Sequence, residues 1–104
     1  MRTAAQNELV AVLKEARAWL SLPDNDFVWS GWEDANEALA ELDLFIERVA
    51  ANSVFDDLNL RVLFAVTGPI QETSLSSGWG REFCELAARF DQALAHYKAS
   101  SIQP

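Results

Sequence analysis

Residues 30–49 read SGWEDANEALAELDLFIERV, and this stretch decides the fold class. Apolar side chains recur in it at spacings of three and four residues, at Trp32, Ala35, Leu39, Leu42, Ile46 and Val49. This period places them on one face of a helix, which we expect to cover residues 31–51. Ser30 and Glu33 form an S-x-x-E capping box in front of it, since each side chain can bind a backbone N–H of the first turn. The stretch therefore predicts an amphipathic helix.

Three further helices are expected around this one. Residues 4–21 repeat the helical period and end before Pro23, which lacks a backbone N–H. Residues 54–66 follow a candidate cap at Ser53 and end at a Gly-Pro pair. Residues 78–98 carry an apolar stripe made of Trp79, Phe83, Leu86, Phe90, Leu94 and Tyr97.

Two connections and one ambiguous segment complete this prediction. Residues 23–30 and 69–77 are typical of long loops. Residues 60–66, LRVLFAV, would also suit a β-strand, but the sequence offers no second convincing strand to pair with it. We therefore expect an all-α, compact single domain over residues 1–104, a bundle of about four helices with two long connecting loops.

The tripeptide Ser-Gly-Trp occurs twice, at residues 30–32 and 77–79, each time in front of a predicted helix. One interpretation is two similar helix starts, in which serine caps the helix, glycine permits a tight turn and tryptophan begins the buried stripe. The other is an aromatic-walled pocket shared by Trp32 and Trp79, which would bind a small molecule.

The net charge of −8 is concentrated in one third of the chain. Residues 1–23 hold three basic and two acidic side chains, giving +1, and residues 58–104 hold four of each, giving 0. Residues 24–57 hold ten acidic side chains and one basic side chain, giving −9. Binding to a phosphate backbone requires clustered Lys and Arg, so we do not expect direct binding to nucleic acid.

The sequence shows no pattern of catalytic, metal-binding or membrane-spanning residues. Cys84 and His96 fall on the same predicted helix, about 18 Å apart along its axis, which is too far for a nucleophilic pair. One cysteine and one histidine leave no zinc ligand set. The longest apolar run, residues 62–66, is far shorter than the ~20 residues that cross a bilayer. Because no signal-peptide pattern is present either, we expect a cytoplasmic binding protein that is not an enzyme and needs no metal or cofactor.

Carboxylates gather on the predicted helix over residues 31–51, opposite to its apolar stripe. Within about 100° of one another lie Glu33, Asp34, Glu37 and Glu41. Like charges four residues apart cost about 0.2–0.5 kcal/mol per pair, and Asp43 with Glu47 adds a further pair on one flank. The helix dipole compensates only the first turn. The pattern therefore favours a binding surface over an ordinary solvated face, which is the alternative interpretation.

Apolar residues accompany these carboxylates. Leu44 projects onto the same side, as an apolar anchor within an acidic collar would. Asp24, Asp26 and Trp29 precede the helix and are expected at the rim of the surface. A complementary partner would be a basic protein, and basic clefts are common in proteins that handle nucleic acids.

In its length, its acidic helix SGWEDANEALAELDLFIERV and its lack of a catalytic set, the whole chain resembles bacterial immunity proteins. These include the colicin type and the type paired with contact-dependent growth-inhibition toxins. The resemblance implies a protein that binds a cognate nuclease toxin, a tRNase or DNase, and masks its active site. Two other acidic binders stay open as alternatives, namely an inhibitor that mimics nucleic acid and a chaperone for a basic effector.

Overall fold

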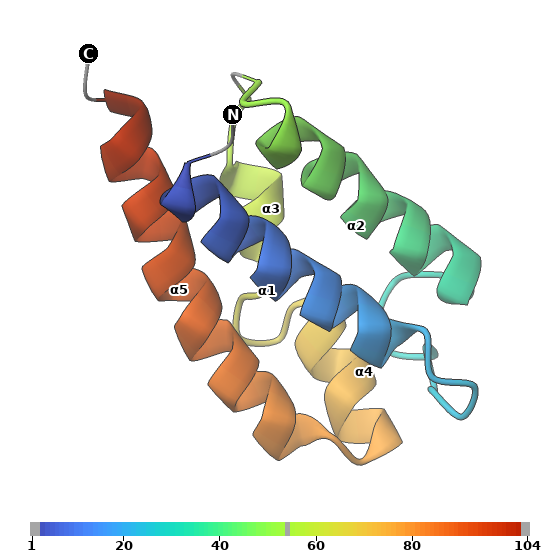
Figure 1. Ribbon diagram of the computed structural model, residues 1–104. Helices are drawn as coiled ribbons and strands as arrows, with labels where there is room; N and C mark the ends of the chain where they lie inside the picture. Colours follow the sequence, from blue (N-terminus) through green and yellow to red (C-terminus); the bar gives the residue numbers. More distant parts are fainter. Residues whose placement is uncertain (1–2, 54, 103–104) are drawn as a thin grey trace.

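The computed structural model describes residues 3–53 and 55–102, without the side chains of residues 101 and 102, and in this part of the chain it is helical (Figure 1). The helices are α1 (Ala4–Leu20), α2 (Ala35–Ala50), α3 (Leu58–Leu63), α4 (Pro69–Ser77) and α5 (Gly80–Ile102). The predicted all-α class is confirmed, with five helices and no strand among the described residues instead of about four helices.

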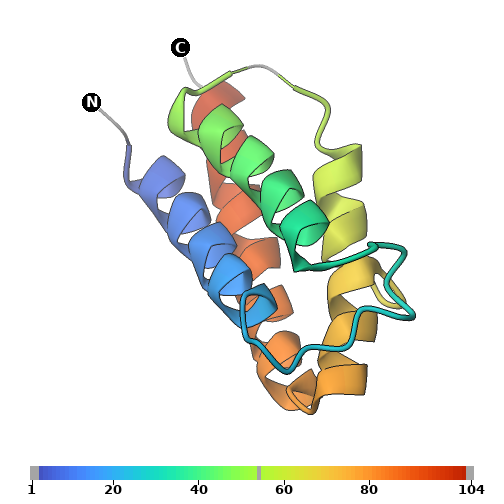
Figure 2. The ribbon, with the colours of Figure 1, turned by 90° about the vertical axis from the view of Figure 1, so that its right-hand side faces the viewer.

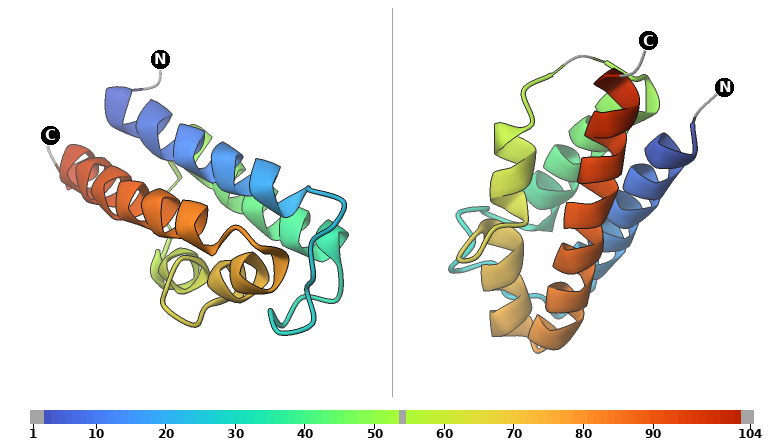
Figure 3. Two further views of the ribbon diagram at one scale, coloured as in Figure 1. Left: turned by 90° about the horizontal axis from the view of Figure 1, so that it is seen from below. Right: turned by 90° about the vertical axis from the view of Figure 1, so that its left-hand side faces the viewer.

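Helix α1 lies between α2 and α5, contacts both and runs antiparallel to both (Figure 1). Helices α3 and α4 follow one another end to end and form a fourth column beside α5 (Figures 2 and 3). The bundle thus has four columns, and the fourth is divided between two short helices. In the described residues no helix combines the length and the apolar character needed to span a bilayer.

Helix α1 is fixed at its N-terminal end and along its buried face. Its N-terminus carries a capping box in which the Thr3 hydroxyl accepts from the Gln6 N–H at 3.0 Å and the Gln6 side chain accepts from the Thr3 N–H at 2.9 Å. The buried Gln6 amide also donates to the carbonyl of Val49 at 3.1 Å, which ties the start of α1 to the end of α2. Along the helix, the fully buried side chains are Leu9, Leu13, Ala16 and Leu20.

The start of α2 differs from the prediction, because the helix begins at Ala35 and its cap is Asp34, whose carboxylate accepts from the Glu37 N–H at 3.0 Å. The Ser30 hydroxyl is engaged elsewhere: it donates to the Phe27 carbonyl at 2.7 Å and accepts from the Trp32 N–H at 3.0 Å. The predicted capping box of Ser30 and Glu33 is therefore wrong. The prediction failed because the Ser30 hydroxyl is bonded within the local turn instead of capping the helix.

Helix α3 is shorter than the predicted helix over residues 54–66, whose first residue lies outside the described part of the chain. It covers six residues and has no side-chain cap, so the expected cap at Ser53 is wrong. The alternative of a strand over residues 60–66 is also wrong. The chain leaves the helix after Leu63 in turns that end at Gly68.

Helix α4 occupies residues 69–77, where the sequence predicted a loop. Pro69 stands in its first turn, which suits a residue without an N–H, and Gly78 ends it in a left-handed conformation with φ 89°. Its buried face includes Thr73 and Ser74, whose hydroxyls donate to backbone carbonyls one turn earlier at 3.0 and 2.7 Å. The sequence did not predict this helix, because its core-facing side includes polar residues whose hydroxyls bond to the helix backbone.

The apolar stripe of α5 is confirmed, since all six residues predicted for it are buried. Within the core, Phe90 stacks on Phe64 with ring centroids 3.9 Å apart, which joins α5 to the end of α3. The helix itself begins at Gly80 and not at residue 78. The two Ser-Gly-Trp segments are thus not two similar helix starts: Gly78 closes α4, whereas Gly31 lies in the loop before α2, both with φ 89°.

Candidate functional site

Three carboxylates at the beginning of α2 are open to solvent. Glu33, Asp34 and Glu37 are exposed, and within the described residues none of them forms an ion pair with Lys or Arg. Within the part of the chain that the structure describes, the hydrogen bonds of their side chains are local: Asp34 caps the helix, and the Glu37 carboxylate accepts from the Glu33 N–H at 3.3 Å. The positive end of the helix dipole favours this placement. These residues form one uncompensated acidic cluster, called here the α2 entry cluster.

Glu41, the fourth predicted carboxylate, is partly buried and bonded inside the protein. Its Oε2 accepts a 2.7 Å hydrogen bond from the indole N–H of Trp32, a side chain that is almost fully buried. A buried indole donor needs such an acceptor. One oxygen of Glu41 is therefore committed to the fold, whereas the hydrogen bonds of Asp34 and Glu37 to described residues join only near neighbours in the sequence.

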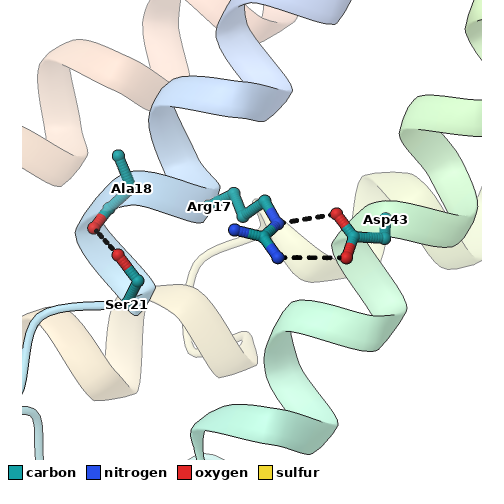
Figure 4. Close-up of polar contacts among 4 residues, drawn as sticks. All are labelled: Arg17, Ala18, Ser21 and Asp43. Atoms are coloured by element: carbon teal, nitrogen blue, oxygen red, sulfur yellow. Dashed lines mark hydrogen bonds and ion pairs between the residues drawn. The ribbon is translucent and has the colours of Figure 1, made fainter.

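The flank of α2 carries a compensated charge. The guanidinium of Arg17 on α1 meets the carboxylate of Asp43 through two hydrogen bonds of 2.6 and 3.2 Å (Figure 4). The hydrogen bond and the charge of Asp43 raise the pKa of Arg17 above its ordinary value. This pair removes Asp43 from the acidic excess, while Glu47 remains exposed. The unpaired charge of the helix is thus concentrated at its N-terminal end.

Leu44 is 43% exposed, as its predicted outward position requires. It lies seven residues beyond Glu37, about two helical turns or 10 Å along the axis. Four residues further on, the Arg48 guanidinium lies 5.7 Å from the ring centre of Phe45 and 5.9 Å from that of Phe55. Along the helix axis, Leu44 therefore lies beyond the α2 entry cluster, towards the C-terminal end of α2.

The loop before α2 contains the other predicted residues, Asp24, Asp26 and Trp29, all of them exposed. Trp29 is 71% exposed and its neighbour Val28 is 76% exposed. The Asp26 carboxylate accepts from the Val28 N–H at 3.0 Å, and the Asp26 N–H donates to the Ser77 hydroxyl at 2.9 Å. This contact holds the loop beside α4 (Figure 2).

Asn25 is a second brace of this loop that the sequence did not suggest. Its amide group donates to the Trp19 carbonyl at 2.7 Å and accepts from the indole N–H of Trp79 at 2.9 Å. One side chain thereby joins the loop to the end of α1 and to the start of α5. The bond between Asn25 and Trp79 spans 54 residues of sequence, so no local sequence pattern predicts it.

Trp32 and Trp79 belong to separate aromatic groups. Trp79 stacks on Trp19 with ring centroids 5.2 Å apart, whereas Trp32 meets Phe27 edge-on at 6.4 Å. An open cavity of about 530 Å³ lies elsewhere, between α5 and the α3–α4 column, with Phe64, Phe83 and Phe90 in its lining. The ring contacts of the described residues give no support to a pocket shared by Trp32 and Trp79.

The groups with nucleophilic or metal-binding chemistry are dispersed. Cys84 is exposed on α5, and His96 on the same continuous helix lies 3.0 Å from the Glu8 carboxylate. Among the described residues, no three His, Cys, Asp or Glu side chains gather in a way that would hold a metal ion. Comparison of the chain with protein-family models, with curated proteins and with solved structures gives no match.

Proposed function

We propose that this chain is an immunity protein that binds and neutralises a cognate nuclease toxin by docking its acidic surface onto the toxin's basic cleft. The observation that carries the proposal is the α2 entry cluster, in which Glu33, Asp34 and Glu37 are exposed together without a cationic partner among the described residues. The identification of the partner as a tRNase or DNase comes from the resemblance to immunity proteins.

The distribution of charge supports this reading of the cluster. No Lys or Arg occurs between residues 18 and 47, so the loop and most of α2 form a continuous anionic segment. Among the described residues, the ion pairs involve other carboxylates than those of the cluster; for example, Asp43 on the flank of α2 meets Arg17, and Glu15 meets Arg89 on α5 at 2.7 Å. Because opposite charges steer association, an anionic face of this kind accelerates encounter with a cationic cleft.

The order of importance within the surface follows from the contacts. Glu33 and Glu37 are free to bind a partner, whereas Asp34 and Glu41 also stabilise the fold through the cap and the indole bond. A charge-reversal test must therefore avoid Asp34 and Glu41, since replacing them would change stability together with charge. Asp24 and Asp26 extend the same anionic surface along the loop.

The test uses the product of the gene that precedes the gene of this protein, which the proposal expects to be a nuclease. The double variant Glu33→Lys and Glu37→Lys is compared with the control Glu85→Lys and Asp91→Lys, which makes the same change of charge at exposed positions of α5. We expect wild type and control to inhibit the nuclease and the first variant to fail, with unchanged helicity of all three by circular dichroism. Inhibition by the Glu33/Glu37 variant at wild-type affinity would overturn the assignment of the surface, and a nuclease that the wild type does not bind would overturn the proposed function.

A further inference from the structure

The tip of the loop between α1 and α2 presents two neighbouring apolar side chains to solvent, Val28 and Trp29, with 76% and 71% of their surfaces exposed. The other three tryptophans of the chain are packed: Trp19 stacks on Trp79, and Trp32 is buried. Val28 and Trp29 thus leave apolar surface exposed to water, and tryptophan has the largest of the side chains. Contact with another molecule would cover this surface.

A tight turn fixes this exposure. The Phe27 carbonyl accepts from the Ser30 N–H at 3.1 Å, so Val28 and Trp29 occupy the two central positions of a β-turn. On one side of the turn the Phe27 ring packs against the core, and on the other side Trp32 is buried. Both ends of the turn are thus anchored while its corner points outward. The backbone at this corner therefore loses little conformational freedom when the turn binds.

The charges around the turn define what can cover it. Four carboxylates lie within five residues of Trp29 along the chain, namely Asp24, Asp26, Glu33 and Asp34, and no Lys or Arg lies within that distance. These charges repel nucleic acid, an anionic membrane and a second copy of a chain with a net charge of −8. A cationic surface is attracted instead. Because the indole of Trp29 lies in the middle of an anionic surface, a complementary partner needs an apolar recess with Lys or Arg at its rim.

We infer that Trp29, rather than Leu44, is the anchor of the docking surface, and that it enters an apolar pocket of a protein partner whose rim carries Lys or Arg side chains. This inference rests on the proposed function, since it concerns the same surface. It adds the recognition chemistry of the partner: a pocket that admits an indole, encircled by cations that meet Asp24, Asp26 and the α2 entry cluster.

The chemistry can be tested with a small probe. A β-cyclodextrin whose primary rim carries ammonium groups offers an apolar cavity encircled by cations, and neutral β-cyclodextrin and a carboxylated form are its matched controls. We expect the aminated probe to bind at least about tenfold more tightly than the neutral one, and the carboxylated one to bind least. In ¹H–¹⁵N spectra the indole N–H of Trp29 should shift, and those of the packed tryptophans should not.

Two variants identify the side chain that binds. Trp29→Ala should abolish binding of the aminated probe, whereas Leu75→Ala, at another exposed apolar position on α4, should leave it unchanged. Equal binding of the aminated and carboxylated probes, or retention of binding by Trp29→Ala, would overturn the inference. Binding of the wild type to phosphatidylglycerol vesicles through Trp29 would overturn it as well, because a membrane would then be the occupant.

The complex with the nuclease separates this inference from the proposed function. Trp29→Ala should weaken the complex by about 30-fold or more, the effect of an interface hot spot, while Leu44→Ala should weaken it less. If the nuclease binds and Trp29→Ala changes the affinity less than Leu44→Ala does, the anchor assignment is wrong and the proposed function stands. If no nuclease binds but the probe behaves as expected, the proposed function is wrong and the surface chemistry stands.

Discussion

Glu41 provides the sharpest test of how the carboxylates of α2 divide between stability and binding. Its Oε2 lies 2.7 Å from the indole nitrogen of Trp32, whose side chain is only 7% exposed. The substitution Glu41→Ala removes the carboxylate that this indole N–H is bonded to. Glu41→Gln keeps an oxygen in reach of the same hydrogen and removes only the charge.

The expected magnitudes follow from the bond that is lost. A hydrogen bond to a charged group is worth about 1.5–3 kcal/mol, so Glu41→Ala should lower the free energy of unfolding by this amount. For a domain of about 100 residues this corresponds to a fall in Tm of roughly 6–12 °C. Glu41→Gln should cost about 1 kcal/mol or less, because a neutral acceptor replaces the charged one.

Urea unfolding followed by circular dichroism measures these differences. Glu37→Ala is the matched control, since Glu37 is an exposed carboxylate of the same helix that accepts a long hydrogen bond, at 3.3 Å, from the Glu33 N–H. We expect it to change the free energy of unfolding by less than about 0.5 kcal/mol. Equal unfolding midpoints for Glu41→Ala and Glu37→Ala would refute the structural role of Glu41.

Two further predictions concern the fold. A Cβ at Gly68 would collide with a backbone carbonyl oxygen of α3, whereas a Cβ at Gly80 would meet only the movable end of an exposed leucine side chain. Gly68→Ala should therefore lower the free energy of unfolding by about 1–3 kcal/mol and Gly80→Ala should leave it unchanged or raise it, and equal urea midpoints would contradict this. The hydrogen bond from Arg89 lowers the pKa of Glu15 below the ordinary value of 4.5, against the opposing effect of burial. The unfolded chain thus binds the proton more tightly, and stability from this pair is lost as pH falls below about 4.5. In urea unfolding across that range, Arg89→Gln should weaken the pH dependence of the free energy of unfolding. Arg81→Gln, at an exposed position of the same helix, should not weaken it. The same pH dependence in both variants would refute the pairing of Arg89 with Glu15.

The sequence predicted those features that depend on a long and regular apolar period. The stripe of α5 is one example, because large side chains from Trp79 to Tyr97 leave no other face for the core. Helix α4 is the opposite case, since Thr73 and Ser74 are buried and their hydroxyls bond to carbonyls of their own helix. In a sequence, polar residues of this kind indicate a loop. The start of α2 was misplaced because Ser30 bonds to Phe27, one turn earlier.

The composition of the candidate surface was predictable only in part. The outward direction of Glu37 follows from helical geometry, whereas Glu33 lies in the loop before α2; both are exposed. The bonds of Glu41 to Trp32 and of Asp43 to Arg17 are tertiary contacts, and they depend on how the loop and α1 pack against α2. Charge patterning along one helix gives the number of carboxylates but not which of them the fold already uses.

The association rate of the protein with its nuclease, measured by stopped flow over a range of salt concentrations, tests whether the α2 entry cluster is the docking surface. If the α2 entry cluster docks on a cationic cleft, the wild-type rate should exceed about 10⁷ M⁻¹s⁻¹ at low salt and fall steeply as salt screens the charges. The Glu33→Lys and Glu37→Lys variant should associate slowly and with little dependence on salt. Equal rates and equal salt dependence for the two proteins would show that the α2 entry cluster does not take part in docking.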